Sequence, residues 1–426
     1  MERRTFLVGS AMALPMMGAG SKVNVAMVGV GGRGTAHVNE YLTIPEARMA
    51  AVCDVNTAAT ERAEQLVYSK TGVKPKIYQD LRKLYEDKDI DAVSIATPNH
   101  WHALCSIWAC QAGKDVYVEK PASYNIFEGQ QMVKAARKYN RMVQVGMQSR
   151  STGYKHRAVE LVRSGAIGKV YYAKGLCYKR RASIGHADDA PVPPGLDWDK
   201  FLGPAPKRAF NPLRFRYNWH WFWDTGNGDI GNQGIHEMDV ARWGLGRGLP
   251  KSVVSTGGKF LYEDDQETPN TQTATFDYGD AQLVFEVRGL STGGGEADLQ
   301  SEKGNFMGNI WMGSKGYLKL DRLGYQIFLG DKREPGPSSK DSEYADTKSH
   351  MVNFLEAVKS RDAKHLNGEI AEGVTSAVLV HMANTSYRLG RKLAFDASTE
   401  KYVNDAEANA MLTRPHYRDP YNPAKI

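Results

Sequence analysis

A glycine pattern that directly follows an apolar run constrains the fold of this chain more than any other feature. Residues 22–28 are mostly apolar or β-branched, which is typical of a strand buried on both faces of a parallel sheet. A G-x-G-x-x-G pattern follows, and residues 35–42 continue as a helix. Such glycines permit a tight turn, close approach of a pyrophosphate at the helix N-terminus, and close helix–strand packing. The predicted cofactor contacts here are Gly29, Gly31, Gly32, Arg33 and Gly34.

The second predicted strand, residues 49–53, ends at an aspartate. Asp54 lies about twenty residues past the last glycine of the pattern, where a ribose-binding acid belongs. A carboxylate there accepts hydrogen bonds from the ribose hydroxyls and repels a 2′-phosphate. The first basic residue after it is Arg62. The sequence therefore favours NAD over NADP as the cofactor.

Strand and helix patterns go on alternating up to residue 147. The apolar runs 90–96, 116–118 and 142–146 are predicted strands, and residues 103–112 and 126–139 are predicted helices. The alternation predicts an α/β fold, with residues 22–147 forming a six-stranded, doubly wound parallel sheet. Ligands of such a sheet bind beyond the carboxyl ends of its strands.

Two motifs at those strand ends make the pattern more specific. Thr97-Pro98-Asn99-His100-Trp101-His102 follows one strand and Glu119-Lys120-Pro121 follows the next. The order of these motifs after G-x-G-x-x-G resembles that of the Gfo/Idh/MocA family, which includes glucose–fructose oxidoreductase and inositol dehydrogenase. The resemblance covers the chain from about residue 22 onward. The resemblance implies that Lys120 contacts nicotinamide and substrate, and that the Lys120–Pro121 peptide is cis. The implied cofactor contacts are Thr97, Pro98, Asn99, His102, Glu119, Lys120 and Gln148.

Physical chemistry also singles out Lys120 without the family. A lysine at a buried strand end, next to a cationic nicotinamide, is disfavoured as an ammonium ion. Its pKa is expected to fall, which makes it a better acid and base near neutral pH.

Residues 148–426 form the second predicted domain, an α+β unit with a large, mainly antiparallel sheet. Alternating runs such as 170–178, 272–278 and 281–288 are separated by glycine-rich turns, which indicates a sheet with one open face. That face is expected to bind substrate or to form a homo-oligomer interface. The helices within 350–390 are expected to pack back on the first domain, and residues 182–216 to form a long binding loop anchored by Trp198, Phe201 and Leu202.

The densest chemistry lies between residues 217 and 239. It resembles a helix of the family in which an acid and a histidine four residues apart face the substrate, and His236 matches the histidine. The acid position holds Asn232, which cannot carry a negative charge but can hydrogen-bond a sugar hydroxyl. Asp229 and Glu237 are alternative carboxylates at less favourable offsets. The predicted substrate contacts are Lys120, Arg150, Tyr178, Trp221, Trp223, Asn232 and His236.

The first 21 residues are set apart from the fold. Arg3-Arg4, followed by a short apolar stretch, resembles a twin-arginine export signal cleaved near residue 20, which predicts a periplasmic protein; a basic cytosolic N-terminus is the alternative. No run approaches the ~20 apolar residues of a spanning helix. The net charge of +7 is dispersed, so no nucleic-acid partner is expected. Cysteine and histidine spacings match no metal site.

The favoured function is a NAD(P)-dependent oxidoreductase that transfers hydride to or from a ring carbon of a sugar, cyclitol or glycoside. Lys120 would polarise or deprotonate the hydroxyl, His236 would act as acid and base, and Asn232 would orient the substrate. Export away from free nicotinamide favours a tightly retained cofactor. Two alternatives stay open: a glycoside hydrolase that works by transient oxidation, elimination, hydration and re-reduction, and a non-catalytic sugar sensor. The intact Glu119-Lys120-Pro121 counts against close membership of the exported N-acetylgalactosaminidases.

Overall fold

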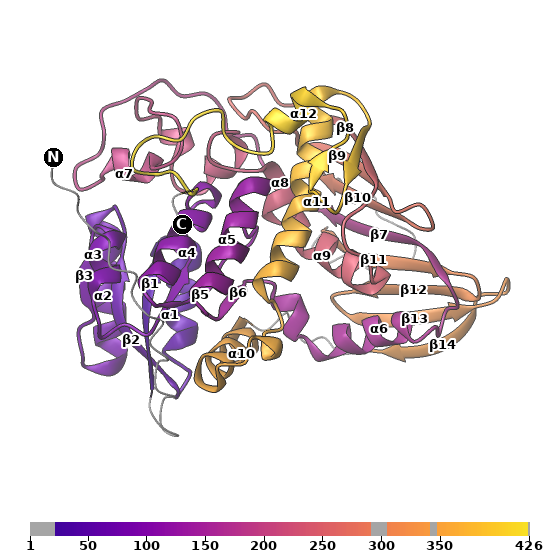
Figure 1. The fold of residues 1–426 in the computed structure, drawn as a ribbon, viewed down its shortest axis with the longest axis horizontal. Coiled ribbons are helices and arrows are strands. Elements are labelled where there is room, and N and C mark those ends of the chain that lie inside the picture. The colour runs from indigo at the N-terminus through magenta and orange to yellow at the C-terminus, as the bar shows by residue number, and fades with distance from the viewer. Residues whose placement is uncertain (1–21, 291–304, 341–346, 425–426) are drawn as a thin grey trace, which may run out of the picture.

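The computed structural model describes residues 22–290, 305–340 and 347–424, and the predicted export signal lies outside them. Two sheets organise the molecule, each with helices packed on it (Figure 1). The N-terminal sheet is parallel and doubly wound, whereas the C-terminal sheet is large and mixed. The predicted fold class is confirmed.

The N-terminal sheet has six parallel strands in the order β3-β2-β1-β4-β5-β6. The chain winds outward in one direction from β1 and in the other from β4, so the sheet has its switch point between these two neighbours. Ligands bind at such a point. The strands are β1 (Val23–Val28), β2 (Ala47–Cys53), β3 (Lys76–Tyr78), β4 (Ala92–Ile95), β5 (Asp115–Val118) and β6 (Val143–Val145).

Five helices cover this sheet, and their ends carry local signals. Asn56 and Asn125 accept hydrogen bonds from backbone N–H groups in the first turns of α2 and α5. Helix α4 begins at Asn99 instead of residue 103, because the turn after Pro98 is already helical and the TPNHWH motif forms its start. The helices are α1 (Gly32–Tyr41), α2 (Thr57–Thr71), α3 (Leu81–Glu86), α4 (Asn99–Gln111) and α5 (Ile126–Lys138).

Among the residues described, the C-terminal sheet has ten strands in the order β14-β13-β12-β11-β7-β10-β9-β8-β15-β16. Its neighbours are antiparallel except β7 and β10, which run parallel over seven residues from Tyr172 and Gln282. The strands are β7 (Val170–Tyr178), β8 (Ser252–Gly258), β9 (Thr271–Asp277), β10 (Gln282–Arg288), β11 (Phe306–Gly313), β12 (Gly316–Asp321), β13 (Gly324–Leu329), β14 (Glu334–Ser339), β15 (Leu393–Asp396) and β16 (Lys401–Tyr402).

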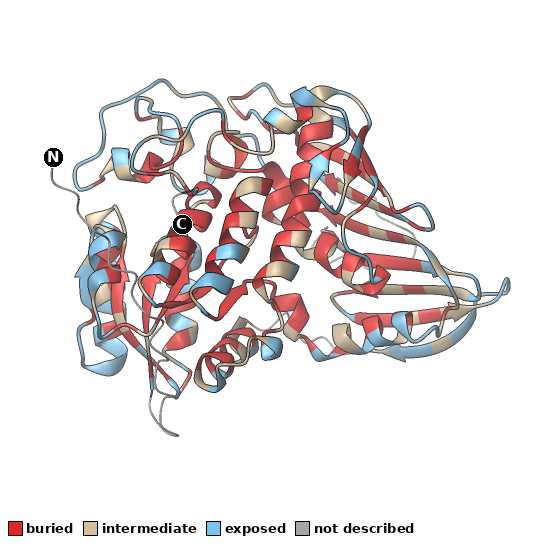
Figure 2. Ribbon diagram, viewed as in Figure 1, coloured by how far each residue is buried: buried red, intermediate tan, exposed pale blue. Residues whose placement is uncertain are grey.

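Helices between the two sheets join them into one body. Helix α11 is buried along most of its length (Figure 2) and lies between α5 and β8. Helix α10 returns to the first sheet, where the ring of Phe354 lies 5.9 Å from that of Tyr117. The remaining helices are η1 (Gln148–Ser151), α6 (Gly153–Arg163), α7 (Trp198–Leu202), η2 (Pro212–Arg214), η3 (Asn218–Trp221), α8 (Gly228–Asn232), α9 (Gly234–Leu245), α10 (Thr347–Ser360), η4 (Ala363–His365), α11 (Ile370–Leu389) and α12 (Ala406–Ala410).

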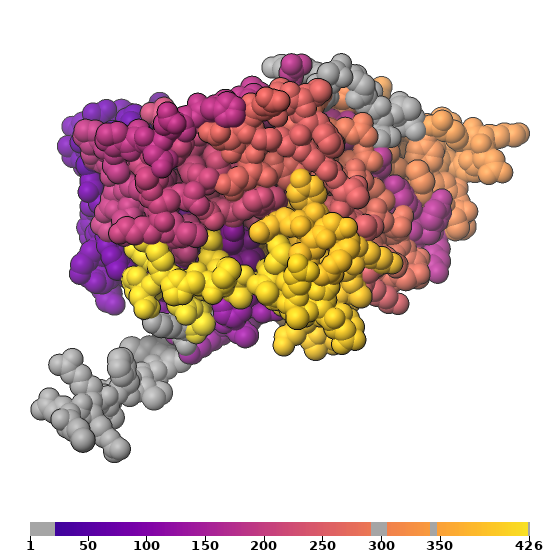
Figure 3. Space-filling view, turned by 90° about the horizontal axis from the view of Figure 1, so that it is seen from above, coloured from indigo at the N-terminus to yellow at the C-terminus, as the bar shows by residue number. Residues whose placement is uncertain are grey.

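The long loop 182–216 packs against the first domain. Its predicted anchors Trp198, Phe201 and Leu202 are buried together in one apolar cluster, as expected. Thr57 at the start of α2 donates through both its backbone N–H and its hydroxyl to the carbonyl of Gly195. The C-terminal segment (yellow in Figure 3) lies against this loop. The loop therefore forms a fixed wall beside the cofactor domain.

Candidate active site

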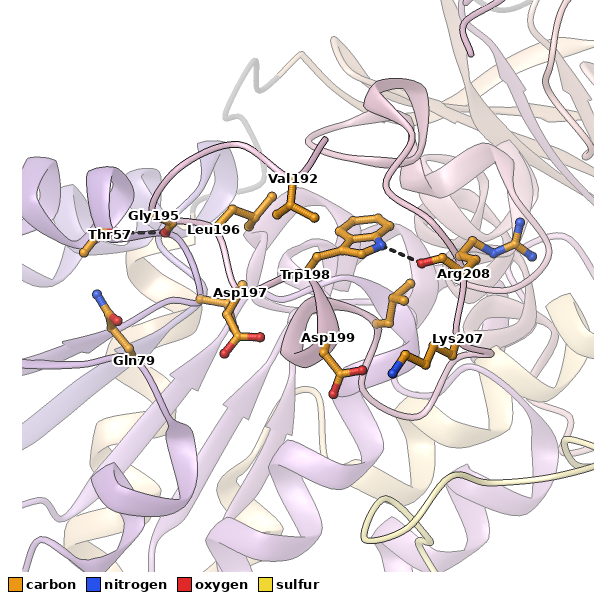
Figure 4. Close-up of a pocket in the computed structure, with 12 residues that line it drawn as sticks. Thr57, Gln79, Val192, Gly195, Leu196, Asp197, Trp198, Asp199, Lys207 and Arg208 are labelled. Carbon is orange, nitrogen blue, oxygen red and sulfur yellow. Dashed lines mark hydrogen bonds between the residues drawn. The ribbon is translucent and has the colours of Figure 1, made fainter. Parts of the chain in front are cut away.

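A cavity of about 1300 Å³ extends from the β1–α1 turn to helix α9. It is lined by residues of the N-terminal domain, of the C-terminal domain and of loop 182–216. Ligand cavities of roughly 300–1,000 Å³ are usual, so this one has room for a dinucleotide and a sugar-sized molecule. A second pocket, of about 620 Å³, lies beside α7 (Figure 4). It is lined by residues such as Thr57, Trp198 and Arg208, and by none of the predicted site residues. The predicted chemistry belongs to the larger cavity.

The glycine turn has the shape that a pyrophosphate needs. Gly29 has φ +82°, and a Cβ on Gly34 would stand 1.8 Å from the carbonyl oxygen of Gly29, so these two positions serve the turn itself. A Cβ on Gly31 or Gly32 would meet no atom within 4 Å, so their outer side is open to the cavity. Helix α1 starts at Gly32 with no side-chain cap, which leaves its first N–H groups for an anion.

Asp54 stands at the end of β2 in the cavity wall. Its carboxylate accepts hydrogen bonds from the backbone N–H of Val30 at 2.8 Å and of Asn56 at 2.9 Å. Burial raises the pKa of this carboxyl, and the two N–H groups oppose the rise. Arg62 lines the same end of the cavity. The predicted role of Asp54 in ribose binding stays a prediction.

Glu119, the first residue of EKP, gathers polar groups beneath the turn. It accepts hydrogen bonds from Arg33 Nε at 2.7 Å and Gln148 Nε2 at 3.2 Å, and its Oε1 lies 2.9 Å from His37 Nε2. Burial opposes its ionisation, but Arg33 and His37 hold the pKa of Glu119 well below its usual range. Three predicted cofactor residues, Arg33, Glu119 and Gln148, are thus held together in one network at the cavity wall.

The TPNHWH segment lines the cavity through Thr97, Pro98, Asn99 and His102. The ring of His102 lies between two backbone carbonyls, 2.9 Å from that of Thr97 and 2.7 Å from that of Pro121. His102 therefore ties the end of β4 to the EKP turn. The Lys120–Pro121 peptide is cis, as predicted.

Lys120 reaches across the cavity to the second domain. Its Nζ donates to the backbone carbonyl of Asn232 at 2.7 Å. Burial lowers the pKa of Lys120, although the nearby Glu119 carboxylate opposes this. The direction of the shift agrees with the expectation from its position, and it favours proton exchange nearer neutral pH.

His236 lies in α9 and Asn232 ends α8, so the single helix predicted for this pair is divided at Gln233. Both residues line the cavity. Burial, reinforced by the charge of Lys120, lowers the pKa of His236 to about 3. The imidazole is therefore neutral at physiological pH. It can hydrogen-bond a hydroxyl, but it does not provide a standing positive charge and is a weak proton acceptor near neutral pH.

Asn232 lines the cavity, and its amide N–H groups are bound within the protein. Its predicted role in orienting the substrate stays a prediction. Asn232 is 6 % exposed, and Nδ2 donates to the hydroxyl of Tyr217 at 2.8 Å and to Asp229 Oδ1 at 3.3 Å. Both amide hydrogens are thereby used within the protein. Asn232 positions Tyr217, a cavity residue that the sequence did not single out as a contact.

Glu237 is a carboxylate that the sequence analysis considered less favourable because of its offset from His236. It lines the cavity, and its Oε2 is buried with no hydrogen-bond partner in the part of the chain that is described. Burial raises the pKa of Glu237 to about 7, although Lys155 opposes the rise. A carboxyl that titrates near neutrality in a cleft is a candidate acid and base. The available signal was a carboxylate directly beside His236 in the sequence.

Four predicted substrate contacts are not among the residues that line the cavity: Arg150, Tyr178, Trp221 and Trp223. The guanidinium of Arg150 is buried against Asp239, with Nε–Oδ2 at 2.8 Å, so its charge serves the interior. The Tyr178 hydroxyl donates to Glu286, and the Trp223 ring lies beneath Arg388 at 5.1 Å. Trp221 is 4 % exposed. The aromatic cavity residues of this region are instead Tyr217, Trp219 and His220.

Within the described ranges, no three metal-ligating side chains cluster into a possible metal site. None of the helices described is long and apolar enough to cross a membrane.

A Rossmann sheet with an open glycine cradle, and a lysine reaching from its edge to a second domain, define a two-domain nucleotide-binding oxidoreductase. Residues 23–147 match the family model described as the oxidoreductase family, NAD-binding Rossmann fold. Residues 166–283 and 325–423 match the oxidoreductase family, C-terminal alpha/beta domain. The chain belongs to the Gfo/Idh/MocA oxidoreductase family.

Relatives of two kinds accompany this assignment. An alpha-N-acetylgalactosaminidase of Shewanella oneidensis is 31 % identical over 157 residues, which is 36 % of this chain but only 34 % of the relative's length. Levoglucosan dehydrogenase, solved with NADH and L-sorbose, superposes with a TM-score of 0.68 at 18 % identity, covering 88 % of this chain and 99 % of that one. The WlbA dehydrogenase of Bordetella pertussis, solved with NADH and UDP-GlcNAcA, gives 0.65 at 19 % identity, with 88 % and 99 % covered. At these identities the two dehydrogenases show a shared fold.

Proposed function

We propose that this protein is a NAD-dependent oxidoreductase that transfers hydride to or from a ring carbon of a sugar, cyclitol or glycoside. The observation that carries the proposal is one cavity that is lined by Gly31 and Gly32 of the glycine turn, by Lys120 and by His236. The outer side of the two glycines is open to it. The dinucleotide would lie along the turn and Asp54, and the substrate would lie between Lys120 and α9. Bound NAD supplies a two-electron hydride acceptor.

The residues of the chain have separable tasks in this reaction. Lys120 hydrogen-bonds the reacting hydroxyl or carbonyl oxygen and polarises it, and its lowered pKa brings its own proton exchange nearer neutral pH. Neutral His236 accepts a hydrogen bond from the same region of the substrate and orients it. The network of Glu119, Arg33 and Gln148 fixes the EKP turn that carries Lys120. Loop 182–216 and α9 wall the site off from bulk water.

The experiment is a binding measurement followed by an activity screen. Purified protein is titrated with NADH by fluorescence, and a tightly retained cofactor would already show nicotinamide absorbance. The protein is then incubated with NAD and a panel of sugars and cyclitols, and reduced nicotinamide is followed at 340 nm. NADH binding together with turnover on a panel member supports the proposal. Failure to bind either form of the nucleotide would rule it out.

The choice of NAD over NADP rests on Asp54. Its carboxylate is held at the strand end by two backbone N–H groups and would repel a 2′-phosphate. Arg62 lies at the same end of the cavity and is the group that would favour NADP. We expect tighter binding of NADH than of NADPH, and this preference to weaken in Asp54→Ala. Equal affinities in the wild-type protein would contradict the assignment.

A redox-neutral glycoside hydrolase is the second candidate, because a relative is named as an alpha-N-acetylgalactosaminidase. Lys120 and His236 would then serve transient oxidation and elimination at one sugar ring. Release of p-nitrophenol from p-nitrophenyl glycosides without added cofactor would support it. Net reduction of NAD without release of the aglycone would favour the dehydrogenase.

Export by the twin-arginine route, with cleavage near residue 20 and a periplasmic location, is part of the proposal and rests on Arg3-Arg4. Replacing both arginines by lysine should retain the protein in the cytosol, as cell fractionation would show.

A homo-oligomer through the C-terminal sheet is proposed as well. On β9, half-buried and buried residues alternate, so one side of this strand is more exposed than the other. Light scattering tests the mass in solution.

A further inference from the structure

We infer that Tyr217 is a catalytic residue that transfers a proton to or from the substrate oxygen, in the place that a carboxylate at position 232 would fill. The inference rests on the proposed function, since it names a further group of the same site. It begins from the finding that Asn232 donates its amide N–H to the phenol oxygen of Tyr217.

The phenol oxygen of Tyr217 has two donors. Asn232 Nδ2 donates to it at 2.8 Å and Arg181 Nη1 at 3.0 Å. A phenol has one O–H of its own. With its acceptor positions taken by these donors, that O–H has to point elsewhere. Tyr217 lines the cavity and is 51 % exposed, so the cavity is the side open to it.

The two donors are also the groups that a phenolate requires. A guanidinium and an amide N–H stabilise negative charge on the oxygen once its proton has left. Arg181 is fixed for this task by Asp229, which it contacts through Nη2–Oδ1 at 2.7 Å and Nε–Oδ2 at 3.1 Å. The cation therefore stands ready beside the phenol before any reaction occurs.

Asn232 connects Tyr217 to the known centre of the site. Its backbone carbonyl accepts the hydrogen bond from Lys120 Nζ at 2.7 Å, while its side chain holds the Tyr217 hydroxyl. Lys120, His236 and Tyr217 all face the same cavity. Asn232, which cannot ionise, thus links the ionisable Tyr217 to Lys120 through its side chain and its backbone.

The proton transfer balances in the direction of ketone reduction. The carbonyl carbon of the substrate gains the hydride that bound NADH supplies, and its oxygen forms a new O–H bond with the Tyr217 proton. The Tyr217 O–H bond breaks, and Arg181 and Asn232 hold the resulting phenolate until water returns a proton. Oxidation of the alcohol runs the same steps in reverse.

The test compares Tyr217→Phe with Tyr68→Phe, a matched control on α2 that is equally exposed at 51 % and does not line the cavity. NADH-dependent reduction of D-fructose, L-sorbose and 3-keto-glucosides is measured from pH 6 to pH 10. For the ketose that turns over, we expect Tyr217→Phe to lower kcat about 100-fold or more, the scale of general acid–base catalysis, with little change in KM. The pH profile of the residual rate should also change shape.

A second readout does not depend on turnover. Tetranitromethane nitrates exposed tyrosines, and peptide mass spectrometry locates the products. Nitration of Tyr217 should fall when NADH and the ketose are bound, whereas nitration of Tyr68 should not. NADH affinity, measured by fluorescence, should be the same in both variants within about threefold.

The outcomes separate this inference from the function beneath it. If the wild-type protein reduces a ketose and Tyr217→Phe keeps its kcat within about threefold, the role of Tyr217 is wrong and the proposed function stands. Unchanged nitration of Tyr217 with both ligands bound leads to the same conclusion. If the wild-type protein neither binds NADH nor reduces any probe, the proposed function fails and this inference falls with it.

Discussion

Lys120 connects the two domains, because it lies at the end of a strand of the Rossmann sheet and donates a hydrogen bond to a backbone carbonyl of the second domain. Its ammonium is stabilised by that one carbonyl and by the neighbouring Glu119 carboxylate, while burial works against the charge. A lysine in this balance can give up a proton without large reorganisation of its surroundings.

Replacing this lysine should separate catalysis from cofactor binding. In Lys120→Met, kcat for hydride transfer should fall by about 10²–10⁴, because the group that polarises the reacting oxygen is lost. NADH affinity should change by less than about tenfold, since the glycine turn and Asp54 are untouched. Fluorescence titration and the 340 nm assay measure the two effects. The exposed Lys83→Met is the control, and full activity in Lys120→Met would contradict the assignment.

Glu237 gives a pH-dependent stability effect of defined sign. Its pKa is about 7 in the folded protein, against about 4.5 in the unfolded chain, so stability is lost as pH rises from 4.5 through 7. Above pH 7 the cost is about 3 kcal/mol at about 1.4 kcal/mol per pKa unit. Glu237→Gln should therefore be more stable than the wild type at pH 8, with the difference shrinking toward pH 5.

Urea unfolding at pH 5, 6.5 and 8 measures this difference. The exposed Glu46→Gln serves as a control and should show no such trend. A constant difference between Glu237→Gln and the wild type across these pH values would show that the carboxyl is not held protonated by the fold.

At the scale of elements, the β1–α1 unit contains two kinds of glycine: some are required by the turn itself, and others line the cavity. A Cβ at Gly34 would collide with the Gly29 carbonyl, which the turn cannot relieve without moving the helix away from the strand. At Gly31 a Cβ meets no protein atom within 4 Å, so only a bound pyrophosphate would feel it.

The two substitutions should behave differently. Gly31→Ala is expected to keep the wild-type Tm within about 2 °C, yet to weaken NADH binding tenfold or more, because the methyl group occupies the path of the phosphates. Gly34→Ala is expected to lower the Tm by several degrees or to prevent folding. Gly248→Ala, also at an open position, is the control for both. Unchanged NADH affinity in Gly31→Ala would mean that the cofactor does not lie along this turn.

The sequence predicted those elements in which a local signal and the burial pattern agree. The strand of residues 22–28, the glycine turn and the EKP strand end were found because apolar runs and glycine spacing describe them completely. The start of α4 at Asn99 was missed because its first turn carries functional residues in place of a helical pattern. Trp221 and Trp223 were misassigned for a different reason: composition shows that aromatic residues gather, but not which of them face a cavity. Tyr217 and Arg181 meet only in three dimensions.

At the scale of the whole molecule, several histidines are buried in neutral form. Burial lowers the pKa of His100, His220, His236 and His381 to about 3 and that of His350 to about 4. The unfolded chain binds these protons near pH 6.5. Folding is therefore stabilised above pH 6.5, and this contribution is lost as the pH falls below it.

Unfolding free energy should consequently fall between pH 6.5 and pH 5, and Glu237, which stabilises the fold on acidification, offsets about one of these histidine protons. The expected slope is about 1.4 kcal/mol per pH unit for each histidine that charges on unfolding. Urea unfolding at half-unit steps measures the slope, and His381→Leu should reduce it by one proton. A stability that stays flat down to pH 5 would contradict the neutral, buried state of these rings.

The C-terminal segment has a consequence for how the chain acquires its fold. The carbonyl of Leu412 accepts from Phe127 N–H at the start of α5, and the ring of Tyr421 lies 5.4 Å from Trp101 on α4. Helices α4 and α5 are made early in synthesis, but they contact residues that are made about 300 positions later. Such a large separation in sequence slows folding through the entropy of loop closure. The nucleotide-binding half therefore cannot reach its final packing until residue 421 has left the ribosome.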